Sequence, residues 1–154
     1  MDIQEATVRH IPDIITLWKE LMDYHKDLDL FFARRKEGHI NFKMHLMECI
    51  KSEDACVFIA VENGEVLGYI LGKIEKHPPV FETETYVEIF DMYVKKVYRR
   101  HKIGAQLVQN IVSYFKKKGV SRIEMKVASK NVTGFDFWKT QGFKEYMKLM
   151  YYTK

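Results

Sequence analysis

The sequence predicts an α/β fold in which helices flank a mixed, mostly antiparallel sheet. Three observations lead to this prediction. Strand-like runs, rich in β-branched and aromatic residues, alternate with segments whose apolar residues recur at helical spacing. The dipeptide Asn63-Gly64 between two such runs is typical of a two-residue hairpin, which makes the flanking strands antiparallel. A basic turn links a later strand directly to a helix, and the predicted order is β-α-α-β-β-β-α-β-α-β.

Length and composition favour a single domain over residues 1–154. Apolar residues make up 47% of the chain and aromatic residues 14%, which is enough for one sizeable core. The chain has no internal repeat, low-complexity segment or flexible linker that would divide it. It also lacks an apolar run of roughly 18 residues and a secretory signal at its start, so we expect a cytoplasmic protein with no membrane partner.

In the first half of the chain, hydrophobic periodicity indicates two helices and three strands. Pro12 suits the first turn of a helix whose apolar stripe continues to Met22 or beyond. The period breaks between Asp27 and Gly38, so this stretch is predicted to be a loop. The predicted elements are a strand at 3–7, the helix from 11, a second helix around 42–50, and strands at 56–61 and 66–74.

The second half is predicted to contain three strands and two helices. The apolar stripe that begins at Ile103 ends near Gly119, a residue suited to a helix C-terminus. The predicted elements are a strand at 84–94, this helix, a strand at 123–127, a helix at 131–141 and a last strand at 143–152. The last strand either completes the sheet of its own chain or pairs across a two-fold axis, so a homodimer is one expected assembly.

Charge, cysteines and histidines exclude several classes of protein. The 25 lysines and arginines exceed the 21 acidic residues by only four, so we expect no nucleic-acid partner. Cys49 and Cys56 fit neither a CxxC motif nor a disulfide framework, and are predicted to be reduced thiols. The six histidines lack the spacing of a metal site, so we expect no metal.

The most informative segment is the basic turn at 95–102, between the strand that ends near Val94 and the helix that begins near Ile103. A helix start presents unpaired N–H groups and the positive end of the helix dipole, which together favour an anion such as a pyrophosphate. Gly104 lets a phosphate approach the backbone closely. The alternative is an ordinary solvated basic face. Neither a GxGxxG turn nor a GxxxxGK[ST] P-loop is present.

This turn and two further segments share their pattern with one known family. The run from Arg99 to Gly104 is similar to the motif Q/R-x-x-G-x-G/A, with Lys102 where the first glycine is usual. The segment 91–94 is similar to the strand that precedes that motif, and 131–143 resembles N-x-x-A-x-x-F-Y-x-x-x-G-F. In order and separation, these segments resemble the GCN5-related N-acetyltransferase (GNAT) superfamily over essentially the whole chain.

The resemblance implies that the chain uses acetyl-CoA as cosubstrate. In this superfamily the fourth and fifth strands splay apart, and the pantetheine arm lies between them like an added strand. Carried over, the amides from Arg100 to Ala105 hold the pyrophosphate, and we hypothesise that the Lys102 ammonium adds a phosphate contact. The residues implied in binding are Met92, Tyr93, Val94, Arg99, Arg100, His101, Lys102, Ile103, Gly104, Ala105, Asn131, Gly134, Phe137 and Trp138.

The implied reaction is direct attack of a neutral amine on the thioester, with the Met92 N–H polarising the thioester carbonyl. Glu88 is the first candidate for the general base, because alternation places it on the same strand face as Met92 unless a bulge intervenes. Asp91 is the second candidate. Either residue is equally well explained as a sheet carboxylate paired with a lysine or arginine.

Trp138 stands where the family usually has a tyrosine that protonates the leaving thiolate, and an indole cannot act as that acid. Either another donor such as Tyr93 or Tyr146 substitutes, or no acid is needed. A second interpretation of Trp138 is a coenzyme A-binding module without catalysis. A small basic nucleic-acid-binding domain, supported only by the turn at 95–102, is the least favoured function.

The acceptor is implied to be a small-molecule or peptide amine. The loop after the first helix carries acidic and aromatic residues, namely Asp23, His25, Asp27, Asp29, Phe31 and Phe32. Either these carboxylates receive a cationic amine beneath an aromatic lid, or they are solvated and both phenylalanines pack inward.

Overall fold

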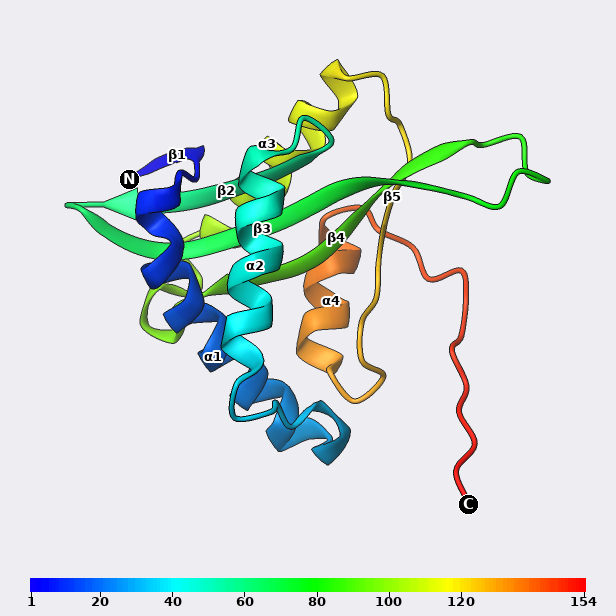
Figure 1. Cartoon of the computed structure of the whole chain (residues 1–154), viewed down its shortest axis with the longest axis horizontal. Helices are drawn as coiled ribbons and strands as arrows, with labels where there is room; N and C mark the ends of the chain where they lie inside the picture. Colours follow the sequence, from blue (N-terminus) through cyan, green and yellow to red (C-terminus); the bar gives the residue numbers. More distant parts are fainter.

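The computed structural model describes residues 1–154 and contains one five-stranded sheet in the order β1-β2-β3-β4-β5. Neighbouring strands are antiparallel except β4 and β5, which are parallel, so the predicted mixed, mostly antiparallel sheet is confirmed. In Figure 1, α1 and α2 lie in front of the sheet and α3 lies behind it. The elements are β1 (Asp2–Glu5), α1 (Ile11–Leu28), α2 (Gly38–Lys51), β2 (Ala55–Glu62), β3 (Glu65–Lys76), β4 (Thr85–Val94), α3 (Ile103–Lys117), β5 (Ile123–Met125) and α4 (Val132–Thr140).

Several boundaries follow local signals in the sequence. Pro12 lies in the first turn of α1, where its missing N–H has no helical partner to lose. Asn63 and Gly64 have φ angles of 51° and 81°, as a two-residue hairpin between β2 and β3 requires. Gly119 has a φ of 82° just after α3 and ends that helix. None of the helices combines the length and apolar character needed to cross a lipid bilayer.

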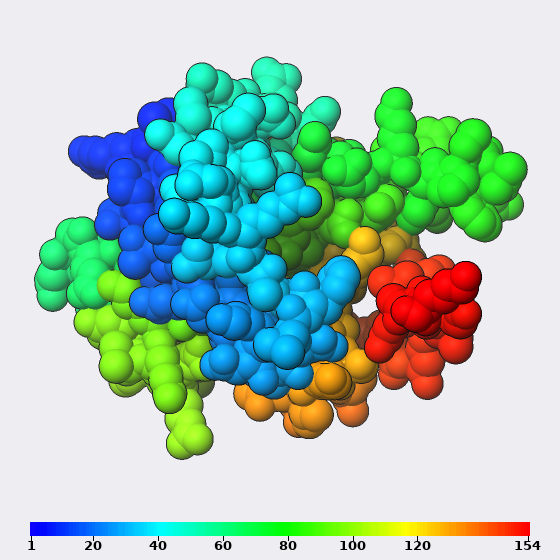
Figure 2. Space-filling view, turned by 60° about the horizontal axis from the view of Figure 1, so that its bottom comes forward, coloured from blue at the N-terminus to red at the C-terminus, as the bar shows by residue number.

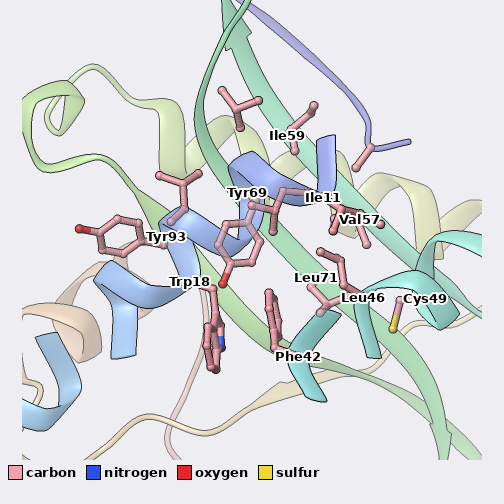
Figure 3. Close-up of a cluster of buried hydrophobic side chains, with 14 of the residues drawn as sticks. Ile11, Trp18, Phe42, Leu46, Cys49, Val57, Ile59, Tyr69, Leu71 and Tyr93 are labelled. Carbon is pink, nitrogen blue, oxygen red and sulfur yellow. The ribbon is translucent and has the colours of Figure 1, made fainter. Parts of the chain in front are cut away.

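The sheet separates two apolar cores. On the side of α1 and α2, Trp18 stacks on Phe42 with ring centroids 4.7 Å apart, and Tyr69 of β3 lies beside them (Figure 3). On the other side, α3 buries Ile111 and Phe115 against the sheet. Both faces of the central strands are therefore covered, which explains the continuous apolar runs of β2 and β3.

A bulge in β4 changes which side chains share a face. Ile89 and Asp91 lie opposite consecutive residues of β3, so Phe90 is an extra residue in the ladder. An extra residue shifts the alternation by one position. Glu88 and Asp91 therefore both face α1 and α2, whereas Met92 packs in the α3 core. The expectation that Glu88 shares a face with Met92 is wrong, because the bulge intervenes.

The last predicted strand, at 143–152, is not formed. Every residue from Lys144 to Lys154 is exposed, and none is in a strand. Figure 1 shows this segment running past α4 and away from the sheet to the C-terminus. A strand needs to pair with an edge as well as to have suitable residues, and the segment pairs with neither β5 nor the open end of β4. β5 is also shorter than predicted, because its pairing with β4 ends at Met125.

The cysteines are free thiols, as predicted. Both are buried, and burial raises the pKa of Cys49 to about 11 and that of Cys56 to about 12. Such thiols are poor nucleophiles at neutral pH, because the thiolate is the reactive form. No group of three or more His, Cys, Asp or Glu side chains lies close enough to hold a metal ion.

Candidate active site

The turn before α3 presents a row of free backbone N–H groups. The N–H groups of the six residues from Arg100 to Ala105 have no hydrogen-bond acceptor in the protein. The first helical bond is donated by the next residue, Gln106, to the Lys102 carbonyl at 3.1 Å. The positive end of the α3 dipole lies at the same place. This arrangement has the geometry of an anion site.

Two residues of the turn have left-handed backbone conformations. Arg100 has a φ of 71° and Lys102 a φ of 62°, values that cost an L-residue about 1–2 kcal/mol each. Left-handed residues in a turn bring successive N–H groups to one concave side, which suits an anion. The conformation also explains why glycine is usual at the position of Lys102 in the motif.

Two substitutions of Lys102 distinguish the effect of its left-handed backbone from the effect of its side-chain charge. Lys102→Gly is expected to raise the free energy of unfolding by about 0.5–1 kcal/mol, because glycine relieves the left-handed strain but loses more chain entropy. Lys102→Ala keeps the strain. If the ammonium contacts a phosphate, both variants bind acetyl-CoA more weakly than the natural chain, and to a similar extent. Urea unfolding and calorimetric titration measure the two effects, and unchanged affinity in Lys102→Ala would refute the phosphate contact.

The basic side chains of the turn divide into two roles. The Arg99 Nε donates to the Val94 carbonyl at 3.1 Å, and its guanidinium lies 5.2 Å from the centroid of the Tyr93 ring. Arg99 therefore braces the turn against the end of β4. Arg100, His101 and Lys102 are exposed and form no ion pair, so their side chains remain available to an anion.

An open strand edge leads to this turn. The β4–β5 ladder ends at the pair Ile89 and Met125, whereas β4 continues to Val94. Beyond that pair, the edge of β4 on the β5 side has no partner strand. The Met92 N–H faces this free edge, whereas Tyr93 pairs with Tyr69 of β3. The structure thus brings the predicted strand residues and the amide turn into one continuous backbone surface.

The start of α3 packs closely against α4 at Gly104. A Cβ on Gly104 would lie 3.2 Å from two ring carbons of Phe137 and 3.6 Å from the Met92 Cε. The absence of a side chain therefore serves helix packing, a role that the sequence does not reveal. Met92, Gly104 and Phe137 come together here from three separate elements.

Asn131 and Gly134 form a helix cap that also connects α4 to α1. The Asn131 Oδ1 accepts a hydrogen bond from the Gly134 N–H at 3.0 Å and another from the Tyr24 hydroxyl at 2.7 Å. A Cβ on Gly134 would lie 2.3 Å from the Asn131 Nδ2, so a larger residue here requires the Asn131 side chain to shift. Sequence reasoning missed Tyr24, because nothing local links it to a residue 107 positions away.

Trp138 is a core aromatic of α4. It is buried, and its ring packs edge to face on Phe137 and Phe143 at centroid distances of 5.2 and 5.1 Å. The two tyrosines considered as replacement acids are also engaged. Burial raises the pKa of Tyr93, and the Tyr146 hydroxyl donates to the Glu124 Oε1 at 2.8 Å, which raises the pKa of Tyr146.

The two candidate carboxylates differ in their surroundings. The Lys126 Nζ lies 3.6 Å from the Glu88 Oε1, an ion pair of the kind the sequence allows. Asp91 has no ion pair or hydrogen bond through its side chain, and burial raises its pKa from 3.8 to about 6. Beside it in β3, the hydroxyl of fully buried Tyr69 lacks a hydrogen-bond partner, and burial followed by the Asp91 charge raises the Tyr69 pKa. Sequence periodicity predicts only a core strand at Tyr69.

Some carboxylates of α1 and the loop after it pair with other groups of the same chain. Asp29 accepts the Phe31 N–H at 3.0 Å and lies 3.5 Å from the Lys130 Nζ, and Asp23 lies 3.8 Å from the Arg34 Nε. Phe31 is 85% exposed, so the expectation that both phenylalanines pack inward is wrong for it. A hollow of about 480 Å³ opens beside the loop, lined by Lys26, Asp27, Leu28, Asp29, Leu30 and Lys130.

The sequence is similar to those of known acetyltransferases. The acetyltransferase (GNAT) family model matches residues 16–143. An N-alpha-acetyltransferase from Sulfurisphaera tokodaii is 30% identical over 113 residues, which make up 69% of this chain and 66% of that protein. The chain spans less than two thirds of the length of the curated relatives it matches, at 60% and 66%.

Solved structures share the fold. A variant of the BH1408 protein from Bacillus halodurans superposes with a TM-score of 0.90 at 23% identity, covering 100% of this chain and 99% of that one. The aminoglycoside N-acetyltransferase AAC(6')-Iy in complex with CoA has a TM-score of 0.75 at 18% identity, covering 99% and 98%. Because the family model spans well over half of the sequence and the fold agrees along its whole length, the chain belongs to the acetyltransferase (GNAT) family.

Proposed function

We propose that residues 1–154 form a single N-acetyltransferase domain that moves the acetyl group of acetyl-CoA to a primary amine in the cytoplasm. The observation that carries the proposal is the run of six unpaired N–H groups from Arg100 to Ala105. Three unpaired basic side chains beside it suit the pyrophosphate of coenzyme A. A surface for a long polyanion would need basic residues well beyond one turn, so the turn suits a single pyrophosphate better than nucleic acid.

The open edge of β4 fits the rest of the cosubstrate. An extended amide-containing arm placed there can pair with the outward-facing backbone groups between Met92 and Val94, as an added strand would. The Met92 N–H is our candidate for the donor that stabilises the developing oxyanion. Phe137 and Trp138 pack on the α3 side of the sheet, and Asn131 and Gly134 form the start of α4, so we assign these four residues to the far side of the cosubstrate site.

We assign the general base to Asp91 rather than Glu88. An amine with a pKa near 10 must lose a proton before it attacks, and a base works best when its own pKa lies near the working pH. Asp91 meets this condition and carries no competing ion pair, whereas Glu88 is held by Lys126. The proton moves from the amine to the Asp91 carboxylate, directly or through one water, as nitrogen attacks the acetyl carbon and the carbon–sulfur bond breaks.

The leaving thiolate needs no protein acid in this scheme. Trp138 cannot donate an ordinary proton, and both candidate tyrosines have raised pKa values. A thiolate is a stable enough leaving group to depart unprotonated, and general-acid help is worth about 10²–10⁴-fold in rate. The domain therefore remains competent for catalysis, which favours an enzyme over a binding module.

Ligand-induced stabilisation and thiol release test this function together. Acetyl-CoA at 100 times its Kd is expected to raise the free energy of unfolding by about 2.7 kcal/mol, measured by thermal shift. A panel of small-molecule and peptide amines, followed by thiol release, then identifies acceptors. Stabilisation without thiol release for any amine would favour the non-catalytic module. No stabilisation at millimolar acetyl-CoA would contradict the proposal.

A further inference from the structure

Three buried polar side-chain atoms of the chain have no hydrogen-bond partner. They are the Arg34 Nε, the His39 Nδ1 and the Tyr69 hydroxyl oxygen. Buried polar groups are almost always paired, because a donor that is shielded from water and left without an acceptor costs stability. All three belong to residues on the side of the sheet covered by α1 and α2, so together they point to one ligand that supplies hydrogen-bond acceptors.

Two of these residues lie at the edge of the Trp18–Phe42 stack. A Cβ on Gly38 would lie 3.6 Å from the Trp18 Cη2 and 3.8 Å from the Arg34 Cβ, so the Arg34 side chain begins beside the indole. His39 follows in the first turn of α2, three residues before Phe42 and therefore on the same side of the helix.

Tyr69 connects the same stack to Asp91. The Tyr69 ring lies 6.4 Å from the Phe42 ring, and Figure 3 shows the hydroxyl directed toward Trp18. Asp91 pairs with Leu71, which is two residues along β3 from Tyr69, and both side chains face α1 and α2. Diagonal neighbours of this kind are about 7–8 Å apart. A small molecule can therefore contact the Asp91 carboxylate and the Tyr69 hydroxyl at once.

The charges on this face complement a molecule with one positive and one negative group. The Asp91 carboxylate has no ion pair, and Arg34 has one only, to the Asp23 Oδ1 at 3.8 Å, which is too long for a hydrogen bond. From these observations we infer that the acceptor is an amine that also carries a carboxylate, with its amino group at Asp91 and its carboxylate bound by Arg34 and Tyr69. The planar guanidinium suits a carboxylate, and the His39 Nδ1 adds a third donor when it carries a proton. The inference rests on the proposed transferase function and adds the class of acceptor.

Arg34 belongs to the segment between α1 and α2, which is weakly attached to the rest of the chain. Residues 30–37 make backbone hydrogen bonds only with their neighbours in sequence, and Leu30 and Phe31 are 77% and 85% exposed. In Figure 2 this segment, in light blue, lies on the outside of the molecule. Because the three unpaired atoms are shielded from solvent, the acceptor reaches them when this segment shifts. The shift breaks no backbone hydrogen bond to another element.

Matched acceptors test the inference. Glycine and β-alanine are each compared with their own carboxamide, and dipeptides that begin with aspartate are compared with dipeptides that begin with asparagine. Measured by thiol release, kcat/KM is expected to be about 10- to 100-fold higher for the acid, the effect of a charge-assisted hydrogen bond. The series in which this preference appears distinguishes a free amino acid from a peptide.

Two variants test the named donors. Arg34→Gln and Tyr69→Phe should each lower the acid-to-amide ratio of kcat/KM at least about tenfold. Tyr69→Phe should also leave Tm unchanged or raise it, because it removes a hydroxyl buried without a partner. A purely structural role of Tyr69 would instead lower Tm and reduce both rates equally. Arg35→Gln, at the exposed neighbouring arginine, is the matched control and should keep the natural ratio.

Failure of this inference and failure of the proposed function give different results. Thiol release at equal kcat/KM for acids and carboxamides would support a transferase and overturn the carboxylate site, and so would an unchanged ratio in both variants. If no amine releases thiol, the transferase proposal fails. Calorimetric titration of the same acids and carboxamides into the chain saturated with coenzyme A then decides the remaining question. Binding of the acids alone supports the carboxylate site, and equal or absent binding overturns it.

Discussion

Replacing Asp91 by asparagine is expected to remove most acetyl transfer and, at the same time, to stabilise the folded chain at pH 8. The loss of the base should lower kcat/KM by about 10²–10⁴-fold with little change in acetyl-CoA affinity. The gain in stability follows from the raised pKa. The folded chain holds the Asp91 proton more tightly than the unfolded chain does, with a pKa of about 6 against 3.8, so the charged carboxylate opposes folding above pH 6. Asparagine removes that penalty, worth about 2–3 kcal/mol.

The stability gained in Asp91→Asn is expected to depend on pH. Below pH 3.8 the carboxyl is neutral in both states, so the variant and the natural chain should differ little in stability. The difference should grow between pH 3.8 and about 6 and then stay constant. In the natural chain, kcat/KM should fall as the pH drops through about 6. The residual kcat/KM of Asp91→Asn should not show this fall at acidic pH.

Glu88→Gln is the matched control for Asp91→Asn. Both carboxylates are on the same face of β4, but Glu88 is paired with Lys126. Breaking this pair should change stability by less than about 1 kcal/mol and leave kcat/KM within a few-fold of the natural value. Equal loss of activity in the two variants, or an unchanged acidic limb in Asp91→Asn, would remove Asp91 from the role of base. Urea unfolding and steady-state kinetics between pH 4 and 9 provide the measurements.

Gly104→Val is expected to impair both the fold and the cosubstrate site. Its Cβ alone would lie 3.2 Å from the Phe137 ring, and the two methyl groups add further bulk between α3 and α4. Overpacking of this kind costs about 1–3 kcal/mol. Because the displaced helix start carries the unpaired N–H groups, acetyl-CoA affinity should fall at least about tenfold, the loss expected from one weakened charge-assisted hydrogen bond.

Gly119→Ala is the control that distinguishes a loss of stability in α3 from damage to the acetyl-CoA site. Gly119 ends the same helix with a φ of 82°, and a Cβ there would meet nothing within 4 Å. Alanine should cost about 1–2 kcal/mol through backbone strain alone and leave the Kd for acetyl-CoA unchanged. Calorimetric titration compares the two variants. If Gly104→Val binds acetyl-CoA as tightly as the natural chain, the start of α3 is not the binding site.

Local signals predict most of the fold. The Asn63-Gly64 hairpin, Pro12 at the start of α1 and Gly119 at the end of α3 each depend on the backbone needs of a few neighbouring residues. The basic turn before α3 is predicted for the same reason, since a helix start always leaves N–H groups unpaired. The structure also shows a left-handed backbone at Arg100 and Lys102. The conformational preferences of arginine and lysine do not predict it.

The errors arise where a contact between distant segments decides the outcome. The Phe90 bulge depends on how β4 registers with β3, and it moves Glu88 and Asp91 to one face against simple alternation. The strand expected at 143–152 has suitable residues but does not pair with the free edge of β5. The raised pKa of Asp91 depends on burial by elements distant in the sequence. The same is true of the Tyr69 hydroxyl, which is buried without a hydrogen-bond partner.

The sequence by itself determined the family and the order of the elements as far as α4, and it predicts the turn at 95–102 as the place for a pyrophosphate, because each depends on residues close together in the chain. Only the tertiary structure decided which carboxylate is half-buried without a partner, how closely Phe137 and Asn131 approach Gly104 and Gly134, and that the C-terminal segment is left unpaired. These properties depend on register and on the distance between packed elements, and an amino-acid pattern within one segment carries no information about either.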